Sequence, residues 1–323
     1  MEVNSTQPQV PAEKNQNGVK QFFADIARGV AIGIAFIIPG FSGGSVAAIL
    51  GVYERLVGAI ADFFKHFKSS IKTLLPIAIG MIVGVAALIF PIQWGLSHAP
   101  IPTVSLFVGL ALGGLPSVTD KCGGGKPSWK HFLALFIPLG LAAGLGFLPV
   151  GKEVDLFSLN AGGYFLLLFI GIIGSSALVI PGISGSMLLL IFGYYDPIVN
   201  MVTGSLLKGQ QVGTCILVLG TLAVGIVAGF FAISVLMKFL LKKFPRGTYF
   251  AILGFIVGSI PAVYLSTVHK YSELSGLYVH AWYWIVSAVL LLVGIALSLI
   301  LVWFAKYRQV KKSEQKAEQK TEE

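Results

Sequence analysis

The sequence predicts an all-α, polytopic membrane protein that contains two inverted repeats. Charged residues make up 11% of the 323 residues, less than half the share of roughly 25% that is usual in soluble proteins. Apolar runs recur from about residue 28 to residue 305, and many reach the length of about 20 residues that a spanning helix needs. A motif containing Pro-Gly occurs twice within these runs. Composition thus predicts the membrane class, and the repeated motif predicts the repeats.

The repeated motif occupies residues 38–57 and 180–199. The first copy begins Ile-Pro-Gly-Phe-Ser-Gly-Gly-Ser, and the second begins Ile-Pro-Gly-Ile-Ser-Gly-Ser. Proline interrupts a helix because it lacks an N–H group and clashes with the preceding turn. In hydrocarbon such a break persists only where protein or a watery cavity satisfies the freed backbone groups. We therefore interpret regions 22–64 and 162–205 as re-entrant helical hairpins.

Six full spans are expected beside the two hairpins. The sequence Gly-Leu-Ala-Leu-Gly-Gly-Leu-Pro at 109–116 also resembles Gly-Phe-Ile-Val-Gly-Ser-Ile-Pro at 254–261, which extends the similarity beyond the motif. A single membrane domain, 21–305, then contains repeat one at about 20–118 and repeat two at about 162–266. Residues 1–20 and 306–323 are expected to be disordered tails because they are polar or charged, and residues 1–20 lack the apolar core of a signal peptide. The six spans are expected at about 72–95, 101–118, 129–149, 212–237, 248–266 and 280–305.

The distribution of basic residues predicts the orientation. If the N-terminus is cytoplasmic and each hairpin returns to its own side, the outer loops hold only Lys152, Lys208 and Lys270. The other loops and the C-terminal tail are richer in lysine and arginine, as the positive-inside rule requires. The net charge of +9 therefore orients the protein and does not indicate nucleic-acid binding. Three spans separate the hairpins, so the repeats are inverted, both termini are cytoplasmic, and a transporter site is expected near the midplane.

Each Pro-Gly precedes residues that are typical of a helix start. Serine is a preferred N-cap whose hydroxyl binds an unpaired amide of the first turn, and glycine lets a ligand approach closely. A helix N-terminus favours anions, phosphate above all, and the motif carries no lysine or arginine that would hold one too tightly. The alternative is that small residues merely pack helices around a kink. The candidate headgroup site comprises Pro39, Gly40, Ser42, Gly43, Gly44 and Ser45 in the first copy, with Pro181, Gly182, Ser184, Gly185 and Ser186 in the second.

Charged residues follow each motif at the expected membrane surface. Glu54 lies twelve residues after Ser42, roughly 18 Å along a helix, whereas half the hydrocarbon thickness is about 15 Å. We therefore place Arg28, Glu54 and Arg55 at the cytoplasmic mouth, where Arg28 and Glu54 are able to pair, and Asp196 at the outer mouth. These residues either recruit a lipid headgroup or anchor the hairpins at the interface.

Other chemistry is not indicated. Ionisable residues mark ion pathways inside membranes, and none is expected at the centre of a span. The five histidines fall in loops or at span ends, and Cys122 and Cys215 form no metal or disulfide pattern. We therefore predict no cofactor and no metal.

The doubled motif, which continues as Gly-Val-Tyr-Glu and Gly-Tyr-Tyr-Asp, resembles the bacterial polyprenyl-phosphate transporter family (PopT) over residues 22–305. The resemblance implies a multi-pass flippase of the cytoplasmic membrane. It would carry undecaprenyl phosphate from the outer to the inner leaflet, and so recycle the lipid carrier for peptidoglycan and other envelope polymers. The implied partners are this lipid and the bilayer. The resemblance implies no catalytic residues.

Two alternatives remain, a membrane polyprenyl-pyrophosphate phosphatase and a small-anion or solute transporter. Membrane phosphatases of that kind carry Pro-Gly-x-Ser-Arg-Ser, and here Gly43 and Gly185 replace the arginine. Phosphoryl transfer needs fixed positive charge at the transition state, so the motif favours a transporter over an enzyme. A solute carrier would be favoured by a charged residue at the midplane, which the sequence does not show.

Overall fold

The computed structural model describes residues 18–37, 42–148, 151–181, 185–206 and 208–321. Within these ranges the chain forms helices and no strands, which confirms the all-α class. Short 3-10 segments follow α5 (Asp120–Cys122) and α11 (Ser272–Val279), and a π-helical segment follows α9 (Met201–Leu206). The α-helices are α1 (Gly18–Ile37), α2 (Gly43–Ile49), α3 (Tyr53–Ala61), α4 (Phe67–His98), α5 (Pro100–Thr119), α6 (Trp129–Leu145), α7 (Ala161–Val179), α8 (Gly185–Ile191), α9 (Tyr195–Asn200), α10 (Val212–Lys243), α11 (Pro245–Lys270) and α12 (Ala281–Thr321).

Among the described residues, six helices are long and apolar enough to cross a membrane. Their number agrees with the six expected spans, but the two sets do not contain the same segments of the chain. The span expected at 129–149 forms only the 17-residue α6, because Gly144 and Gly146 weaken the helix where it ends. Helix α7, which was expected to be one arm of a hairpin, is among the six by its length and composition. The six segments are Phe67–Leu88, Pro100–Cys122, Ala161–Val179, Val212–Lys243, Pro245–His269 and Ala281–Ile300.

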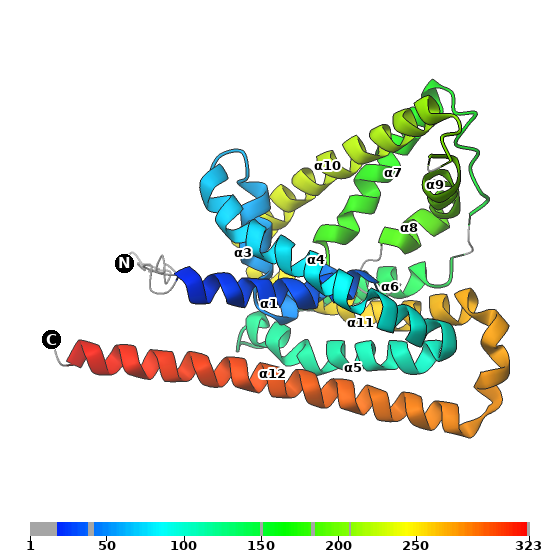
Figure 1. The fold of residues 1–323 in the computed structure, drawn as a ribbon. Coiled ribbons are helices and arrows are strands. Elements are labelled where there is room, and N and C mark those ends of the chain that lie inside the picture. Colours follow the sequence, from blue (N-terminus) through cyan, green and yellow to red (C-terminus); the bar gives the residue numbers. More distant parts are fainter. Residues whose placement is uncertain (1–17, 38–41, 149–150, 182–184, 207, 322–323) are drawn as a thin grey trace.

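The two motif-containing regions double back from opposite ends of the molecule (Figure 1). Helix α1 runs from one end to the middle, and α3 returns toward the same end, while α8 and α9 return toward the other end. The start of α1 and the end of α12 both lie at the first end. We call this first end the basic end, because it also carries α3, the α5–α6 connection and the lysine-rich turn between α10 and α11. The far end, with α9 and the α11–α12 connection, is the opposite end.

The two copies of the motif adopt the same local structure. After each Pro-Gly a seven-residue helix forms, α2 in the first copy and α8 in the second. Each of these helices is followed by a glycine with positive φ, +69° at Gly51 and +75° at Gly193. Glycine is needed there because the left-handed conformation is costly for residues that carry a Cβ. The next helix begins at Tyr53 or Tyr195, so the sequence match extends to the backbone.

Glycines bring the long helices of each half into close contact. A Cβ added at Gly29 of α1 would lie 3.0 Å from the Cα of Gly80 of α4. A Cβ added at Gly171 of α7 would lie 3.0 Å from the Cα of Gly225 of α10. Only small residues permit two helix backbones to approach so closely. The α1–α4 and α7–α10 pairs are therefore corresponding pairs.

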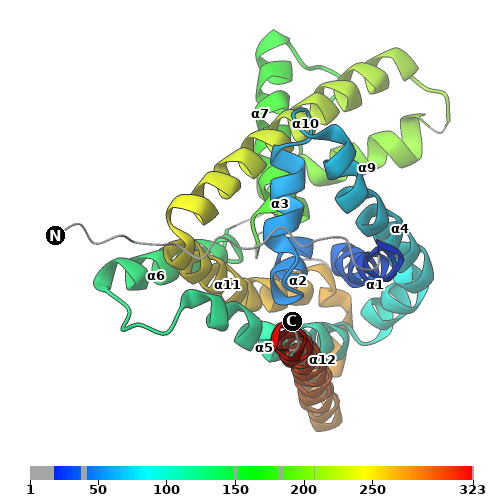
Figure 2. The ribbon, with the colours of Figure 1, turned by 90° about the vertical axis from the view of Figure 1, so that its left-hand side faces the viewer.

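Helices α6 and α12, which follow the two repeats in the chain, each pack on the last helix of the opposite repeat, α6 on α11 and α12 on α5. A Cβ added at Gly109 of α5 would overlap the carbonyl of Leu291 of α12, and one added at Gly254 of α11 would overlap the carbonyl of Leu135 of α6. The α5–α12 and α6–α11 pairs thus meet at matching glycines. In both pairs the two helices are far apart in the chain. Figure 2 shows α12 lying beside α5. The α5–α12 and α6–α11 contacts thus join each repeat to the helix that follows the other repeat, and α6 and α12 occupy equivalent places.

Candidate functional site

The two copies of the motif meet in the middle of the molecule. Helix α2 begins with Gly43 and Gly44, both buried. A Cβ added at Gly44 would lie 3.3 Å from the Cα and N of Pro181, and 3.3 Å from the carbonyl oxygen of Val179. Such contacts are tighter than most real Cβ contacts, so only glycine fits there without displacement. The first motif is therefore docked directly on the second.

Two hydroxyl groups of the first motif bind the end of α7. The Tyr53 hydroxyl donates to the carbonyl of Val179 at 2.8 Å. The Ser42 hydroxyl lies 3.4 Å from the carbonyl of Ala177 and 3.5 Å from that of Ile180. The last carbonyls of a helix lack partners within it, and these side chains provide them. Ser42 was expected to cap its own helix; it stands at the N-cap of α2, but its hydroxyl makes no capping bond there.

The remaining predicted headgroup residues are placed as follows. Ser45 is buried within α2, and Gly185 begins α8 with its missing Cβ facing Ala177 at 3.3 Å. The first turn of α2 is thus enclosed by protein in this conformation and does not line an open cavity. Pro39, Gly40, Gly182, Ser184 and the side chain of Ser186 lie outside the described part of the chain.

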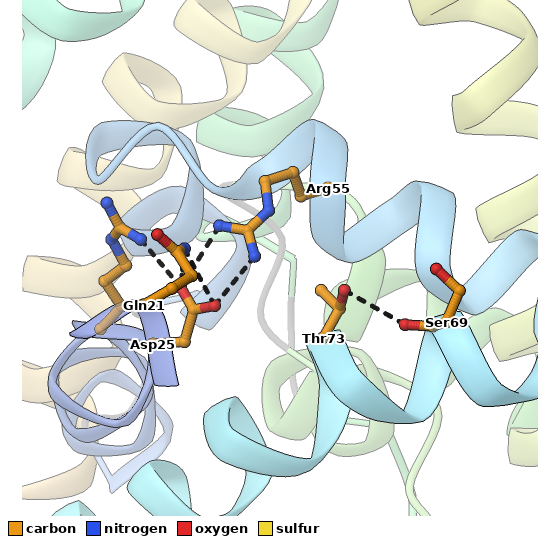
Figure 3. A network of polar contacts seen from close by, with 6 residues as sticks. Gln21, Asp25, Arg55, Ser69 and Thr73 are labelled. Atoms are coloured by element: carbon orange, nitrogen blue, oxygen red, sulfur yellow. Dashed lines mark hydrogen bonds and ion pairs between the residues drawn. The ribbon is translucent and has the colours of Figure 1, made fainter. Parts of the chain in front are cut away.

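A charged cluster joins α1 to α3 at the basic end (Figure 3). Asp25, whose side chain is only 2% exposed, accepts hydrogen bonds at 2.8 Å from both Arg28 and Arg55. Gln21 also donates to both carboxylate oxygens at 3.1 Å. The sequence allowed a pair between Arg28 and Glu54, but Arg28 pairs with Asp25, three residues before it on the same helix, and Glu54 pairs with Lys121. The two guanidinium groups remain partly exposed, so the cluster presents a net positive surface.

Removing the negative charge from this cluster tests whether it is a structural clamp. We expect Asp25→Asn to lower the free energy of unfolding by about 1–3 kcal/mol, because two charge-assisted hydrogen bonds are weakened. Thermal unfolding of the purified protein in detergent measures this. Thr73→Val on the neighbouring helix α4 is the matched control, because it removes only an exposed hydroxyl bonded to Ser69. Equal stability of both variants would contradict the clamp.

Glu54 belongs to a second cluster that joins the two halves. Lys121, after α5, donates to Glu54 at 3.1 Å and to the hydroxyl of Tyr249 of α11 at 3.0 Å. Tyr249 also donates to Glu54. Burial opposes ionisation of Glu54, but the hydrogen bonds from Tyr249 and the charge of Lys121 outweigh it and hold its pKa below the ordinary value. A carboxyl with a lowered pKa stays ionised at neutral pH, so Glu54 is unsuited to carry protons there.

Further contacts close the basic end between the halves. Lys238 of α10 forms an ion pair with Asp62 at the end of α3. Arg246 of α11 donates at 2.8 Å to the carbonyls of Cys122 and Gly125 in the α5–α6 connection. Beneath these polar contacts, buried side chains of α2, α3, α10 and α11 form one apolar cluster. The described ion pairs all lie at this end of the molecule.

The second hairpin is not docked in the same way. Helix α3 packs along α10, and α2 packs against α5 and α7. Among the described residues, α9 makes at most slight contact with α4, and α8 makes at most slight contact with α1 and α11. Asp196, at the start of α9, is exposed and lies at the opposite end from Glu54. Two locally equivalent hairpins therefore occupy different positions relative to the rest of the fold.

Comparison with known proteins identifies the family. A family model described as VCA0040-like, undecaprenyl phosphate translocase-like, matches residues 32–279. The chain belongs to this family. It is 30% identical over 289 residues to a polyprenyl-phosphate transporter of Staphylococcus aureus, covering 88% of this chain and 97% of the relative. It is 26% identical over 260 residues to a polyprenyl-phosphate transporter of Vibrio cholerae, covering 75% and 78%. No solved structure shows significant similarity.

Membership confirms the resemblance seen in the sequence, and the names of the relatives indicate a transporter. The sequence reasoning missed Asp25, Asp62, Lys121, Lys238 and Tyr249. One signal for Asp25 was available, because its spacing of three from Arg28 places both on one helix face. The other four contact partners on distant segments, so they could be found only from the fold.

Proposed function

We propose that this protein carries a polyprenyl phosphate, such as undecaprenyl phosphate, from the outer to the inner leaflet of the bacterial cytoplasmic membrane. The lipid carrier would then return to the synthesis of envelope polymers. Family membership and the names of two relatives support the substrate. The observation that carries the mechanism is the unequal docking of two equivalent hairpins on one shared centre.

The unequal docking corresponds to one state of an alternating-access cycle. We place the basic end in the cytoplasm, following the positive-inside rule. The first hairpin then closes the cytoplasmic side through the contacts of Glu54 and Asp62, while the second hairpin leaves the outer side unsealed. In the opposite state, the second hairpin would dock and the first would be released. Inverted repeats commonly produce two such states by exchanging conformations.

The phosphate would bind where the motifs meet. When α2 leaves α7, the hydroxyl of Ser42 and the first-turn amides of α2 lose their protein surroundings. They are then free to donate to a phosphate, which a helix N-terminus favours. By equivalence, the start of α8 provides the same groups from the other side. The phosphate would replace the α7 carbonyls as the partner of Ser42, which couples substrate binding to release of the hairpin.

An enzymatic role is less well supported. Ser42, Gly43, Gly44 and Ser45 of the first motif place no guanidinium or ammonium group at the start of α2, and no group of metal-ligating residues occurs in the described part of the chain. Stabilising the transition state of phosphoryl transfer needs such positive charge. The arginine clusters at the basic end serve Asp25 and the α5–α6 connection instead.

Reconstitution tests the proposal. We expect proteoliposomes to move a fluorescent polyprenyl phosphate between leaflets faster than protein-free liposomes, as measured by quenching of the outer-leaflet label. Equal rates would refute the transporter. Two further measurements separate the alternatives: release of inorganic phosphate from a polyprenyl pyrophosphate would indicate an enzyme, and uptake of free phosphate without lipid movement would indicate a solute carrier.

A further inference from the structure

An apolar groove of about 290 Å³ lies between α10 and α11, outside the motif itself. The two helices diverge from the turn that joins them, and Figure 2 shows this divergence. Leu236, Met237 and Leu240 line the groove on α10, and Ala251, Ile252 and Phe255 line it on α11. We call it the α10–α11 groove.

The groove has a buried floor and an open rim. Met237 and Ile252 at its floor are 6% and 1% exposed, whereas Leu236 at its rim is 50% exposed. The hydroxyl of Thr248 also lines the groove, but it donates to the carbonyl of Phe244 at 2.8 Å. No lining side chain therefore offers an unsatisfied polar group. A surface of this kind suits a hydrocarbon and offers nothing to a polar ligand.

The groove begins at the motif and ends at basic residues. Ile180, which immediately precedes the second Pro-Gly, lines its inner end, and the carbonyl of Ile180 lies 3.5 Å from the hydroxyl of Ser42. At the other end of the groove lies Phe244, which follows Lys242 and Lys243 in the chain. The groove therefore runs directly from the proposed phosphate position toward the α10–α11 turn. An amphiphile whose anionic head lies beside Ser42 would place the start of its hydrocarbon tail in this groove.

We propose that the α10–α11 groove holds the part of the isoprenoid tail nearest the phosphate. This inference rests on the proposed function and adds a binding surface for the hydrocarbon part of the substrate. The volume of about 290 Å³ lies just below the range of ligand pockets, roughly 300 to 1,000 Å³, so the groove accommodates only the first isoprene units. The remainder of the tail stays in the bilayer. The methyl branches of the first units would fill the floor between Met237 and Ile252.

Photolabelling of the wild-type protein tests the groove directly. A polyprenyl phosphate with a diazirine on its first isoprene unit, and a phospholipid with a diazirine in its acyl chain, are each irradiated with proteoliposomes. We expect the prenyl probe to label α10 and α11 between residues 236 and 255, and unlabelled polyprenyl phosphate to compete. Equal labelling by the phospholipid probe, without competition, would show that the groove holds only bilayer lipid and would overturn the proposal.

A filled groove provides the second test. Ala251→Phe places a large side chain in the groove, and Val235→Phe, on a lipid-exposed face of α10 (53% exposed), is the matched control. We expect Ala251→Phe alone to slow transport by about tenfold, because overpacking a site commonly costs 1–3 kcal/mol. If the wild type transports lipid, but the two variants transport at equal rates and the prenyl probe gives no specific labelling, the groove proposal is refuted while the proposed function stands. No transport by the wild type would refute the proposed function, and the groove with it.

Discussion

Gly44→Val is expected to reduce transport of polyprenyl phosphate strongly while the protein remains folded. The Cβ of valine would lie 3.3 Å from Pro181 and from the carbonyl of Val179, and its two methyl groups would extend further into the second motif. Forcing additional atoms into such a packed contact costs about 1–3 kcal/mol. The first hairpin would no longer dock, so the cytoplasmic side would not close, and transport should fall by at least about tenfold.

Gly58→Val provides the control for this substitution. Gly58 lies on α3 of the same hairpin, but no atom lies within 4 Å of a Cβ added there. Both substitutions replace a helical glycine by valine and change helix propensity alike. The fluorescence assay in proteoliposomes compares them, and detergent thermal unfolding confirms that both fold. Equal transport by Gly44→Val and Gly58→Val would show that close docking of the motifs is not required.

A cross-link between α3 and α10 is expected to arrest transport completely and reversibly. Asp62 at the end of α3 and Lys238 of α10 form an ion pair that joins the two halves at the basic end. Cysteines at both positions, joined by a cleavable bifunctional reagent, would hold the first hairpin on the second half. The cycle needs this hairpin to leave, so the cross-linked protein should not move lipid.

The native cysteines must be removed before this cross-linking experiment. Cys122 and Cys215 are free and buried, so both are first replaced by alanine. The two single-cysteine variants, treated with the same reagent, control for modification without a cross-link. Cleaving the reagent should restore transport in the double variant. Undiminished transport by the fully cross-linked protein would rule out movement of α3 away from α10.

The repeat itself could be predicted from sequence, because helix breaks and left-handed backbone conformations require proline and glycine, and both residue types are recognisable in the sequence. Pro39 and Pro181 mark the helix breaks, and Gly51 and Gly193 mark the positive-φ positions that follow. The packing of α6 on α11 and of α12 on α5 could not be predicted in this way. The packing depends on which helix meets the glycines of α5 and which meets those of α11. The sequences of α6 and α12 are similarly apolar, so they do not show which of the two helices goes where.

The candidate site was predicted only in outline. The motif residues were identified, but Ser42 was expected to cap α2, and instead its hydroxyl lies against α7. The hydroxyl has the same local chemistry in either case, so only the packing of the two halves decides its partner. The Asp25 cluster was missed for a related reason, since Arg55 reaches Asp25 across 30 residues of chain.

If the two hairpins dock in alternation, the distances from the two hairpins to the helices on which they dock must change in opposite directions. Spin labels at Asp62 and Lys238 report the first hairpin. Labels at Gly204, 142 residues after Asp62, and at Gln93, 145 residues before Lys238, report the second, because these offsets align Gly51 with Gly193 and Gly109 with Gly254. Pulsed electron resonance in proteoliposomes gives both distances, without and with polyprenyl phosphate. We predict that the lipid lengthens the first distance and shortens the second in the same fraction of molecules. A first distance that stays short while the protein transports lipid would contradict the alternation.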